Sequence, residues 1–135
     1  TFVPGSLRVR DVGAGDVNGD GQIDLLIGSD TEILAALGPL ETATLSPLLA
    51  FGAQALAVGD LDGNGRADLV TVGDDPMAVH LSRASGFETV ELPQWSDVMT
   101  SVVVGDLDGD ADLDAVTLMP NFGAVIWWNR GEQTQ

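Results

Sequence analysis

Short apolar runs recur along the chain, each bounded by glycine, proline, or acidic and amide residues. They are arranged around three acidic segments, with one run before each segment and two runs after it. Runs of this length are too short for helices, and the residues between them favour turns, so the pattern predicts β-strands. The runs are residues 12–14, 25–27 and 32–37, then 56–58, 69–72 and 77–81, and finally 102–104, 115–118 and 124–128.

A fourth, weaker strand is predicted at the outer side of each unit. Residues 87–92 form it in the second unit, and its counterpart in the first lies within residues 43–50. The stretch 31–50 is also rich in alanine and leucine, but its glycine and prolines interrupt a helix there. Four short strands in about 45 residues are typical of one blade of a β-propeller. The expected fold is therefore all-β, with three four-stranded antiparallel blades in one chain.

The three acidic segments align without gaps, and their spacing defines a repeat. Residues 16–24, 60–68 and 106–114 begin 44 and 46 residues apart, and joining the two ends of the chain gives a third spacing of 45. Spacings of this size indicate propellers or other repeat arrays. We therefore predict a single three-blade unit over residues 1–135, with repeats 10–53, 54–98 and 99–135. In this arrangement the strand 1–9 completes the last blade.

Three blades are too few to close a ring, because known propellers have roughly four to eight. One possibility is a homo-oligomer, in which two copies give six blades, and the even spacing favours it. The other is a piece of a longer propeller, in which case the missing repeats complete the ring. An engineered or excised fragment with no function of its own would show the same pattern.

The charge of the chain narrows the choice of partners. Its 135 residues carry 21 acids and 5 arginines, for a net charge of −16. This balance argues against nucleic acid and anionic membranes, which require a basic surface, and favours cations.

No apolar run approaches the ~20 residues of a membrane span, so we expect no membrane insertion. A signal peptide is not evident at residues 1–4, and the absence of cysteine excludes disulfides and thiolate metal sites.

Eleven of the 21 acids lie in the three aligned segments, which we call the loops and number from position 1 to position 9. Oxygen-bearing side chains occupy positions 1, 3, 5 and 9, and a tight turn can direct alternate side chains at one point. Ca²⁺ takes 6–8 oxygen ligands, and position 7 would add its backbone carbonyl. The candidate ligands are Asp16, Asn18, Asp20, Gln22 and Asp24 in the first loop, Asp60, Asp62, Asn64, Arg66 and Asp68 in the second, and Asp106, Asp108, Asp110, Asp112 and Asp114 in the third.

Two alternatives to calcium-binding turns deserve comparison, an ion-free turn and an EF-hand. Three to five acids within nine residues repel one another, and Arg66 is the only base in the loops, so ion-free loops would be costly. An EF-hand requires an acidic residue at position 12, where this chain has Ile27, Thr71 and Thr117. Mg²⁺ is less suitable because it demands octahedral geometry. We therefore expect Ca²⁺ at about three sites per chain. Position 6 requires a positive φ, and Ala111 replaces the glycine of the other loops there.

Two of the loops, with the residues next to them, resemble the FG-GAP/VCBS repeat. They are residues 15–26, Gly-Asp-Val-Asn-Gly-Asp-Gly-Gln-Ile-Asp-Leu-Leu, and residues 59–70, Gly-Asp-Leu-Asp-Gly-Asn-Gly-Arg-Ala-Asp-Leu-Val. That repeat is known from the propeller of integrin alpha subunits, from fungal propeller lectins and from bacterial surface proteins. The resemblance covers essentially the whole chain as three repeats. It implies calcium ions at positions 1, 3, 5 and 9 of each loop, which brace the hairpin between the two inner strands. The small blade number and Ala111 depart from the family pattern.

The remaining chemistry-bearing side chains point away from catalysis. His80 is the single histidine and lies in a predicted strand, and no nucleophile motif accompanies it, so we predict no enzyme. Trp127 and Trp128 should point to opposite faces of one strand, so one should pack between blades while the other could be exposed and contact a sugar. Trp95, in a connection between strands, is the better exposed candidate.

The predicted function is a calcium-binding module that acts as a non-catalytic binding, adhesion or self-assembly scaffold. Its partner would be a protein or a glycan, and its location extracellular, on the cell surface or periplasmic, where millimolar calcium fills weak sites. A lectin that holds sugar between its blades is the alternative.

Overall fold

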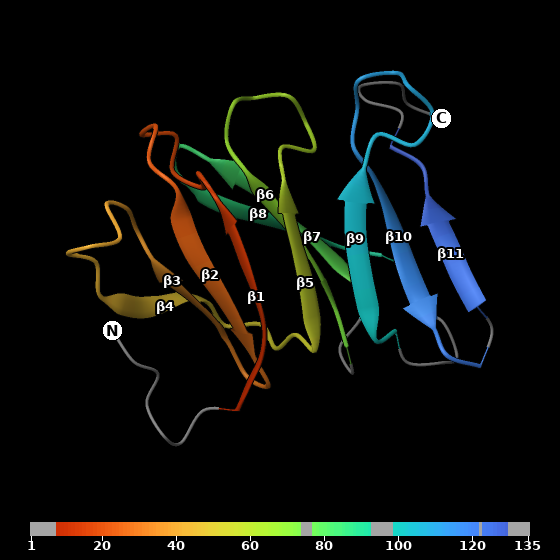
Figure 1. Cartoon of the computed structure of the whole chain (residues 1–135), viewed down its shortest axis with the longest axis horizontal. Coiled ribbons are helices and arrows are strands. Elements are labelled where there is room, and N and C mark those ends of the chain that lie inside the picture. Colours follow the sequence, from red (N-terminus) through yellow and green to blue (C-terminus); the bar gives the residue numbers. More distant parts are fainter. Residues whose placement is uncertain (1–7, 74–76, 93–98, 122, 130–135) are drawn as a thin grey trace.

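The computed structural model describes residues 8–73, 77–92, 99–121 and 123–129 (Figure 1). All regular structure in these ranges is β-strand, arranged in three antiparallel sheets, as the sequence predicts. The sheets do not close into a ring within the described residues (Figure 1). No helix long and apolar enough to cross a lipid bilayer occurs among those residues.

Each sheet is an up-and-down blade in which strands that follow one another along the chain pair as hairpins. The order is β1-β2-β3-β4 in the first blade, β5-β6-β7-β8 in the second and β9-β10-β11 in the third. The strands are β1 (Val9–Gly15), β2 (Asp24–Ser29), β3 (Ile33–Ala36), β4 (Leu45–Leu49), β5 (Ala55–Gly59), β6 (Asp68–Val72), β7 (Ala78–Arg83), β8 (Gly86–Glu91), β9 (Ser101–Gly105), β10 (Asp114–Met119) and β11 (Gly123–Trp127).

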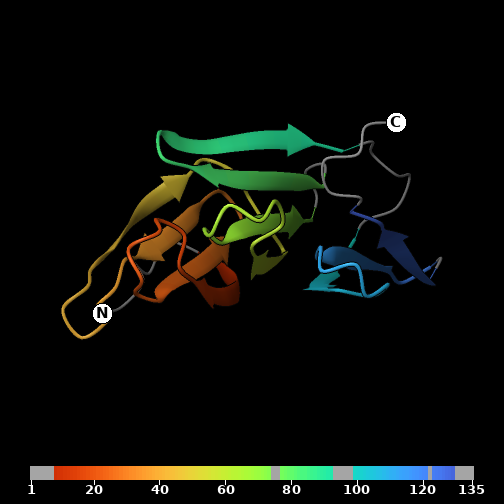
Figure 2. The same ribbon diagram turned by 90° about the horizontal axis from the view of Figure 1, so that it is seen from above.

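The first strands of the three blades, β1, β5 and β9, lie side by side, and the acidic loops that follow them lie at one end of the molecule (Figure 1). Seen from above, the second blade runs from β5 to β8 at its opposite edge (Figure 2). The inner strands approach closely because glycine leaves room for the neighbouring blade. A Cβ atom at Gly13 would lie 2.7 Å from a methyl group of Val58.

Two apolar clusters fill the spaces between the blades. Leu26 and Ile33 of the first blade pack with Leu69 of the second, whereas Val70 of the second packs with Met119 of the third. Neighbouring residues of β6 thus serve opposite clusters, because successive side chains of a strand point to opposite faces. All five residues of β6 are buried, which fits a strand enclosed on both sides.

The outer strands bear out two predictions. Strand β4 lies within residues 43–50 and β8 covers most of residues 87–92, and the described part of 31–50 contains no helix. The predicted completion of the last blade by residues 1–9 falls mainly on residues 1–7, which lie outside the described residues. Val9 begins β1 and pairs with Ser29 of the first blade. Trp95 also lies outside the described residues.

His80 lies in strand β7, as predicted, and is a core residue. Its side chain is fully buried, with Nε2 3.0 Å from the Thr71 hydroxyl and Nδ1 2.8 Å from the Thr89 hydroxyl. The Phe51 ring packs edge-on against it, with 4.9 Å between ring centroids. Burial lowers the pKa of His80 from 6.5 to about 4. The imidazole is therefore neutral at pH 7 and serves the core.

The loops adopt left-handed backbone conformations at position 6. The φ angle is 84° at Gly21 and 87° at Gly65, and Ala111 has a φ of 75° at the same position of the third loop. The expected positive φ is therefore present in all three loops. An alanine pays roughly 1–2 kcal/mol for this conformation, so the third loop carries strain that the other two lack.

We expect acid to destabilise the fold through His80. Its folded pKa lies below the unfolded value of 6.5, so the stability contributed by the neutral imidazole is present above pH 6.5 and is lost as the pH falls toward about 4. Between pH 7 and pH 5, the free energy of unfolding should fall by about 2 kcal/mol less in the variant His80→Gln than in wild type. Urea unfolding at both pH values and one calcium concentration measures this, and an equal pH dependence in the two proteins would contradict it.

The variant Ala111→Gly should unfold with a higher free energy, by up to about 1 kcal/mol, because it relieves the left-handed strain while loosening the unfolded chain. Gly21→Ala and Gly65→Ala should lower the free energy by a similar amount. A Cβ at either glycine meets nothing within 4 Å, so these variants test the backbone alone. Urea unfolding of the three variants checks the prediction, which is wrong if Ala111→Gly is less stable than wild type.

Candidate metal centre

The carboxylate at position 1 folds each loop around itself. The Asp60 carboxylate accepts the backbone N–H groups of positions 4, 5 and 6 at 2.9, 3.2 and 2.9 Å. Asp16 and Asp106 accept the same three groups in their own loops at distances of 2.8–3.2 Å. The N–H of position 6 is the main cause that lowers the pKa of Asp16 and of Asp106. The ionised carboxylate thus stabilises the turn.

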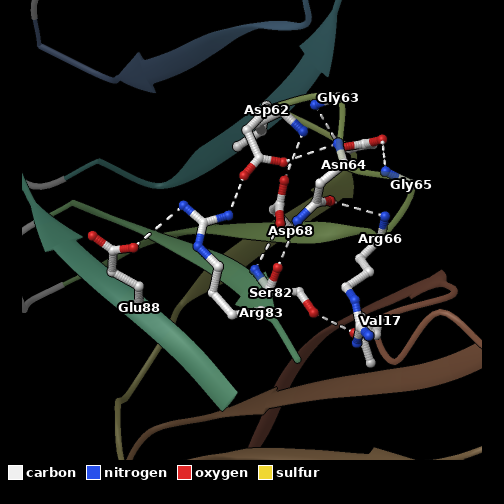
Figure 3. A network of polar contacts seen from close by, with 12 residues as sticks. Val17, Asp62, Gly63, Asn64, Gly65, Arg66, Asp68, Ser82, Arg83 and Glu88 are labelled. Atoms are coloured by element: carbon white, nitrogen blue, oxygen red, sulfur yellow. Dashed lines mark hydrogen bonds and ion pairs between the residues drawn. The ribbon is translucent and has the colours of Figure 1, made fainter. Parts of the chain in front are cut away.

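The aspartate at position 9 is buried in all three blades and bridges two parts of its blade. One Asp68 oxygen accepts the N–H of Leu61 at 2.7 Å, and the other accepts the N–H of Ser82 at 2.7 Å (Figure 3). Burial raises the pKa of Asp68, and together with the charges of Asp62 and Asp60 it outweighs the two hydrogen bonds that lower it. Asp24 and Asp114 make the corresponding pairs of bonds in the other blades.

Positions 1, 3 and 9 bring their oxygens together. One carboxylate oxygen from each of Asp60, Asp62 and Asp68 lies within 4.8 Å of the others, and the third loop has the same arrangement. The residues of that cluster are Asp106, Asp108 and Asp114. In the first loop Asn18 holds position 3, so an amide replaces one carboxylate. Ligands of one Ca²⁺ lie no more than roughly 5 Å apart, so this all-oxygen donor set fits a calcium ion.

Positions 5 and 7 take other contacts. The side-chain oxygens of Asp20, Asn64 and Asp110 each accept the N–H of position 7 in their own loop, at 2.9–3.0 Å. The Arg66 side chain leaves its loop and donates to the carbonyl of Asn18 at 2.9 Å. Of the predicted ligands, the described structure therefore gathers positions 1, 3 and 9 in the second and third loops, while position 5 supports the loop backbone.

Arg83, which the sequence pattern does not single out, reaches the second loop from β7. It pairs with Asp62 and, through its other terminal nitrogen, with Glu88 at 3.2 Å (Figure 3). Burial would raise the pKa of Asp62, but the hydrogen bond and charge of Arg83, with smaller effects of hydrogen bonds to Asn64 and Asp60, lower it. Only the register of β7 places Arg83 here, so sequence spacing gives no signal for it.

The third loop has no comparable arginine among the described residues. Desolvation raises the pKa of Asp108, and the neighbouring Asp110 carboxylate raises it further. Five aspartates therefore share this loop with no base paired to them in the described ranges. The third loop is the one in which a bound cation would relieve the most repulsion.

A cavity of about 750 Å³ lies between the second and third blades. Its lining includes Arg83, Asp112, Trp127, Trp128 and Asn129. The Trp127 indole donates to the Thr117 hydroxyl at 2.9 Å and packs against the core between these blades, whereas Trp128 is 46% exposed. One tryptophan thus packs between blades and its neighbour is exposed, as predicted for successive residues of one strand.

Comparisons with known proteins agree with this architecture. A family model described as an FG-GAP-like repeat matches residues 16–71 and again residues 60–117. T-cell immunomodulatory protein is 32% identical to the chain in Rattus norvegicus, 33% in Mus musculus and 32% in Homo sapiens, each over 118 residues. Each match covers 73% of this chain and 19% of the relative. The chain spans about a fifth of the length of the curated relatives it matches.

Both matches of the family model start at the first aspartate of a loop and extend past the next loop. They span the paired loops and inner strands from which the three blades are built. The chain therefore belongs to the FG-GAP-like repeat family.

Proposed function

We propose that this chain is a calcium-binding propeller module that acts as a non-catalytic binding or adhesion scaffold. FG-GAP repeat domains are generally non-catalytic modules of this kind. The observation that carries the calcium proposal is the convergence of the carboxylates at positions 1, 3 and 9 in two of the loops. Positions 5 and the carbonyl of position 7 would complete the ligand set.

A bound cation would act mainly on structure. Each loop joins the first two strands of its blade, so a cation held there would fix one hairpin. It would also offset part of the net charge of −16, which otherwise repels the loops from one another. Weak loops of this kind fill at millimolar calcium, so we propose an extracellular, cell-surface or periplasmic location.

We also propose that a second copy covers the end faces of the chain. Val12 is 57% exposed, whereas Leu56 and Val102, one and two repeats later, are 4% and 6% exposed inside the interfaces between blades. At the other end Leu118 is 44% exposed, whereas Val72, one repeat earlier, is 2% exposed. Packing the first blade of one copy on the third blade of another would repeat the internal interface and give six blades.

A carbohydrate ligand is the second candidate, and the cavity between the second and third blades favours it. Exposed Trp128 offers an apolar face beside the polar side chains of Arg83, Asp112 and Asn129. A glycan array probed with wild type and Trp128→Ala separates the two candidates: binding lost in the variant supports a lectin, and an empty array supports a scaffold without sugar.

Removing calcium should lower the melting temperature, because a ligand that binds only the folded state stabilises it by about 2.7 kcal/mol per site at a hundredfold excess over Kd. Asp108→Ala should remove one of about three bound ions, whereas Asp30→Asn, on an exposed residue outside the loops, should remove none. Thermal unfolding with and without chelator and calorimetric titration measure both effects. An unchanged melting temperature together with no heat of binding would contradict the proposal.

Light scattering in calcium should give twice the chain mass of 14.0 kDa if a second copy covers the end faces. Val12→Asp should shift the mass to that of one chain, because it places a charge in the apolar interface. Asp30→Asn serves again as the control that leaves the mass unchanged. A wild-type mass of one chain at micromolar concentration would contradict the assembly and leave the calcium proposal untouched.

A further inference from the structure

We propose that the three loops are joined by one continuous chain of hydrogen bonds, so that a cation bound in one loop favours binding in the next. Ser82 and Asn129 are the positioning residues that connect the blades in this chain. The inference rests on the proposed calcium binding and adds to it a coupling between the sites. Nothing in the sequence motif of a single loop predicts it, because both residues lie outside the loops.

The first connection joins the first and second loops. The N–H of Val17 donates to Asp24 at 2.8 Å, and the carbonyl of Val17 accepts the hydroxyl of Ser82. The N–H of Ser82 then donates to Asp68 at 2.7 Å (Figure 3). The two position-9 aspartates are therefore linked through the backbone of one residue, Val17, on one side and through Ser82 on the other.

The second connection repeats this arrangement between the second and third loops. The N–H of Leu61 donates to Asp68 at 2.7 Å, and the side-chain amide of Asn129 donates to the Leu61 carbonyl at 2.6 Å. The N–H of Asn129 donates to Asp114 at 2.8 Å, and the second oxygen of Asp114 accepts the N–H of Leu107 at 3.0 Å. The chain thus runs without a gap from the first loop to the third.

Three residues occupy the same place in their blades and show which side chain the connection requires. Gly38, Ser82 and Asn129 follow the position-9 aspartate by 14, 14 and 15 residues, and each donates its N–H to that aspartate. Ser82 and Asn129 also donate through their side chains to the preceding loop. Gly38 belongs to the first blade, which no loop precedes within the described residues, and it has no side chain to donate.

The position-9 aspartates and Ser82 are shielded from water, whereas Leu61 and Asn129 are half-buried. Asp24, Asp68 and Asp114 are fully buried, and Ser82 is 2% exposed. Buried hydrogen bonds are costly to leave unmade, so these groups move together rather than separately. A cation that fixes one position-9 carboxylate also fixes the peptide bonded to it, and the next loop is then ordered at lower entropic cost.

The boundary between the first and second loops and the boundary between the second and third loops differ in the number of hydrogen bonds that cross them. Between the first and second loops, Arg66 also donates to the Asn18 carbonyl at 2.9 Å and the N–H of Ala67 to the Asp16 carbonyl at 2.8 Å. In the third loop the residue that corresponds to Arg66 is Asp112, whose carboxylate cannot donate. Asn129 therefore carries a larger share of the coupling at the second boundary than Ser82 does at the first. Removing Asn129 should consequently have the clearer effect.

The test disables the third loop and observes the second. The backbone N–H of Leu61 donates to Asp68, so its amide resonance reports occupancy of the second loop during a calcium titration by NMR. Asp108→Ala should weaken calcium binding at the second loop by about fivefold or more. Charge repulsion between bound ions would have the opposite effect. Emptying the third loop removes that repulsion and leaves its carboxylates free to attract calcium to the second loop. A weakening therefore reports the hydrogen-bond chain.

Asn129 is then tested in a double-mutant cycle. In Asn129→Ala protein, Asp108→Ala should change the Leu61 midpoint by less than about twofold. Asn129→Ser uses the residue that makes the same connection in the second blade and should restore part of the effect. Ser46→Ala, on an exposed residue of β4, is the control that leaves the effect intact. Dispersed amide spectra of each variant establish that it is folded.

The outcomes are separable. If Asp108→Ala leaves the Leu61 midpoint unchanged, or if the change persists in Asn129→Ala, the coupling is absent and calcium binding itself still stands. If the Leu61 resonance does not respond to calcium in wild-type protein and no heat of binding is seen, the proposed function fails, and this inference fails with it.

Discussion

The buried aspartate at position 9 is the interaction on which the rest of each blade depends. An ionised carboxylate is costly to bury unless hydrogen bonds compensate it. Asp68 meets this requirement with two backbone N–H donors, one from its own loop and one from the end of β7. The same carboxylate lies beside Asp60 and Asp62. One side chain therefore fixes the loop to its sheet, holds the register of the hairpin and contributes to the cation site.

The loops achieve their shape before any ion is considered. The position-1 carboxylates collect three N–H groups each, and the residues at position 6 adopt the left-handed conformation that turns the chain sharply. A cation that enters such a turn meets oxygens already near one another, so little ordering remains to oppose binding. In the second loop, the positive charge of Arg83 already lies beside Asp62. In the third loop, the described residues place only other aspartates beside Asp108. Sites of similar sequence thus differ in the charge that surrounds them.

Much of the fold follows from local patterns in the sequence. Short apolar runs between turns determine the strands, and the recurrence of the loops determines the blades, so both were predictable from residues such as Asp16, Asp60 and Asp106. The gathering of positions 1, 3 and 9 also followed from alternation within a turn. Arg83, Ser82 and Asn129 were not predictable, because contacts between strands and between blades bring them to the loops. At position 5 one side-chain oxygen accepts a backbone N–H of the same loop, a contact that the spacing of the acids did not predict.

The account as a whole rests on the loops being cages for a divalent cation. The most direct measurement is the anomalous scattering of crystals grown in calcium and collected at long wavelength. The account predicts a peak within about 2.3–2.6 Å of the carboxylate oxygens at positions 1, 3 and 9 of each loop. Well-ordered loops with no anomalous peak at millimolar calcium, or peaks that lie only at other sites, would contradict it.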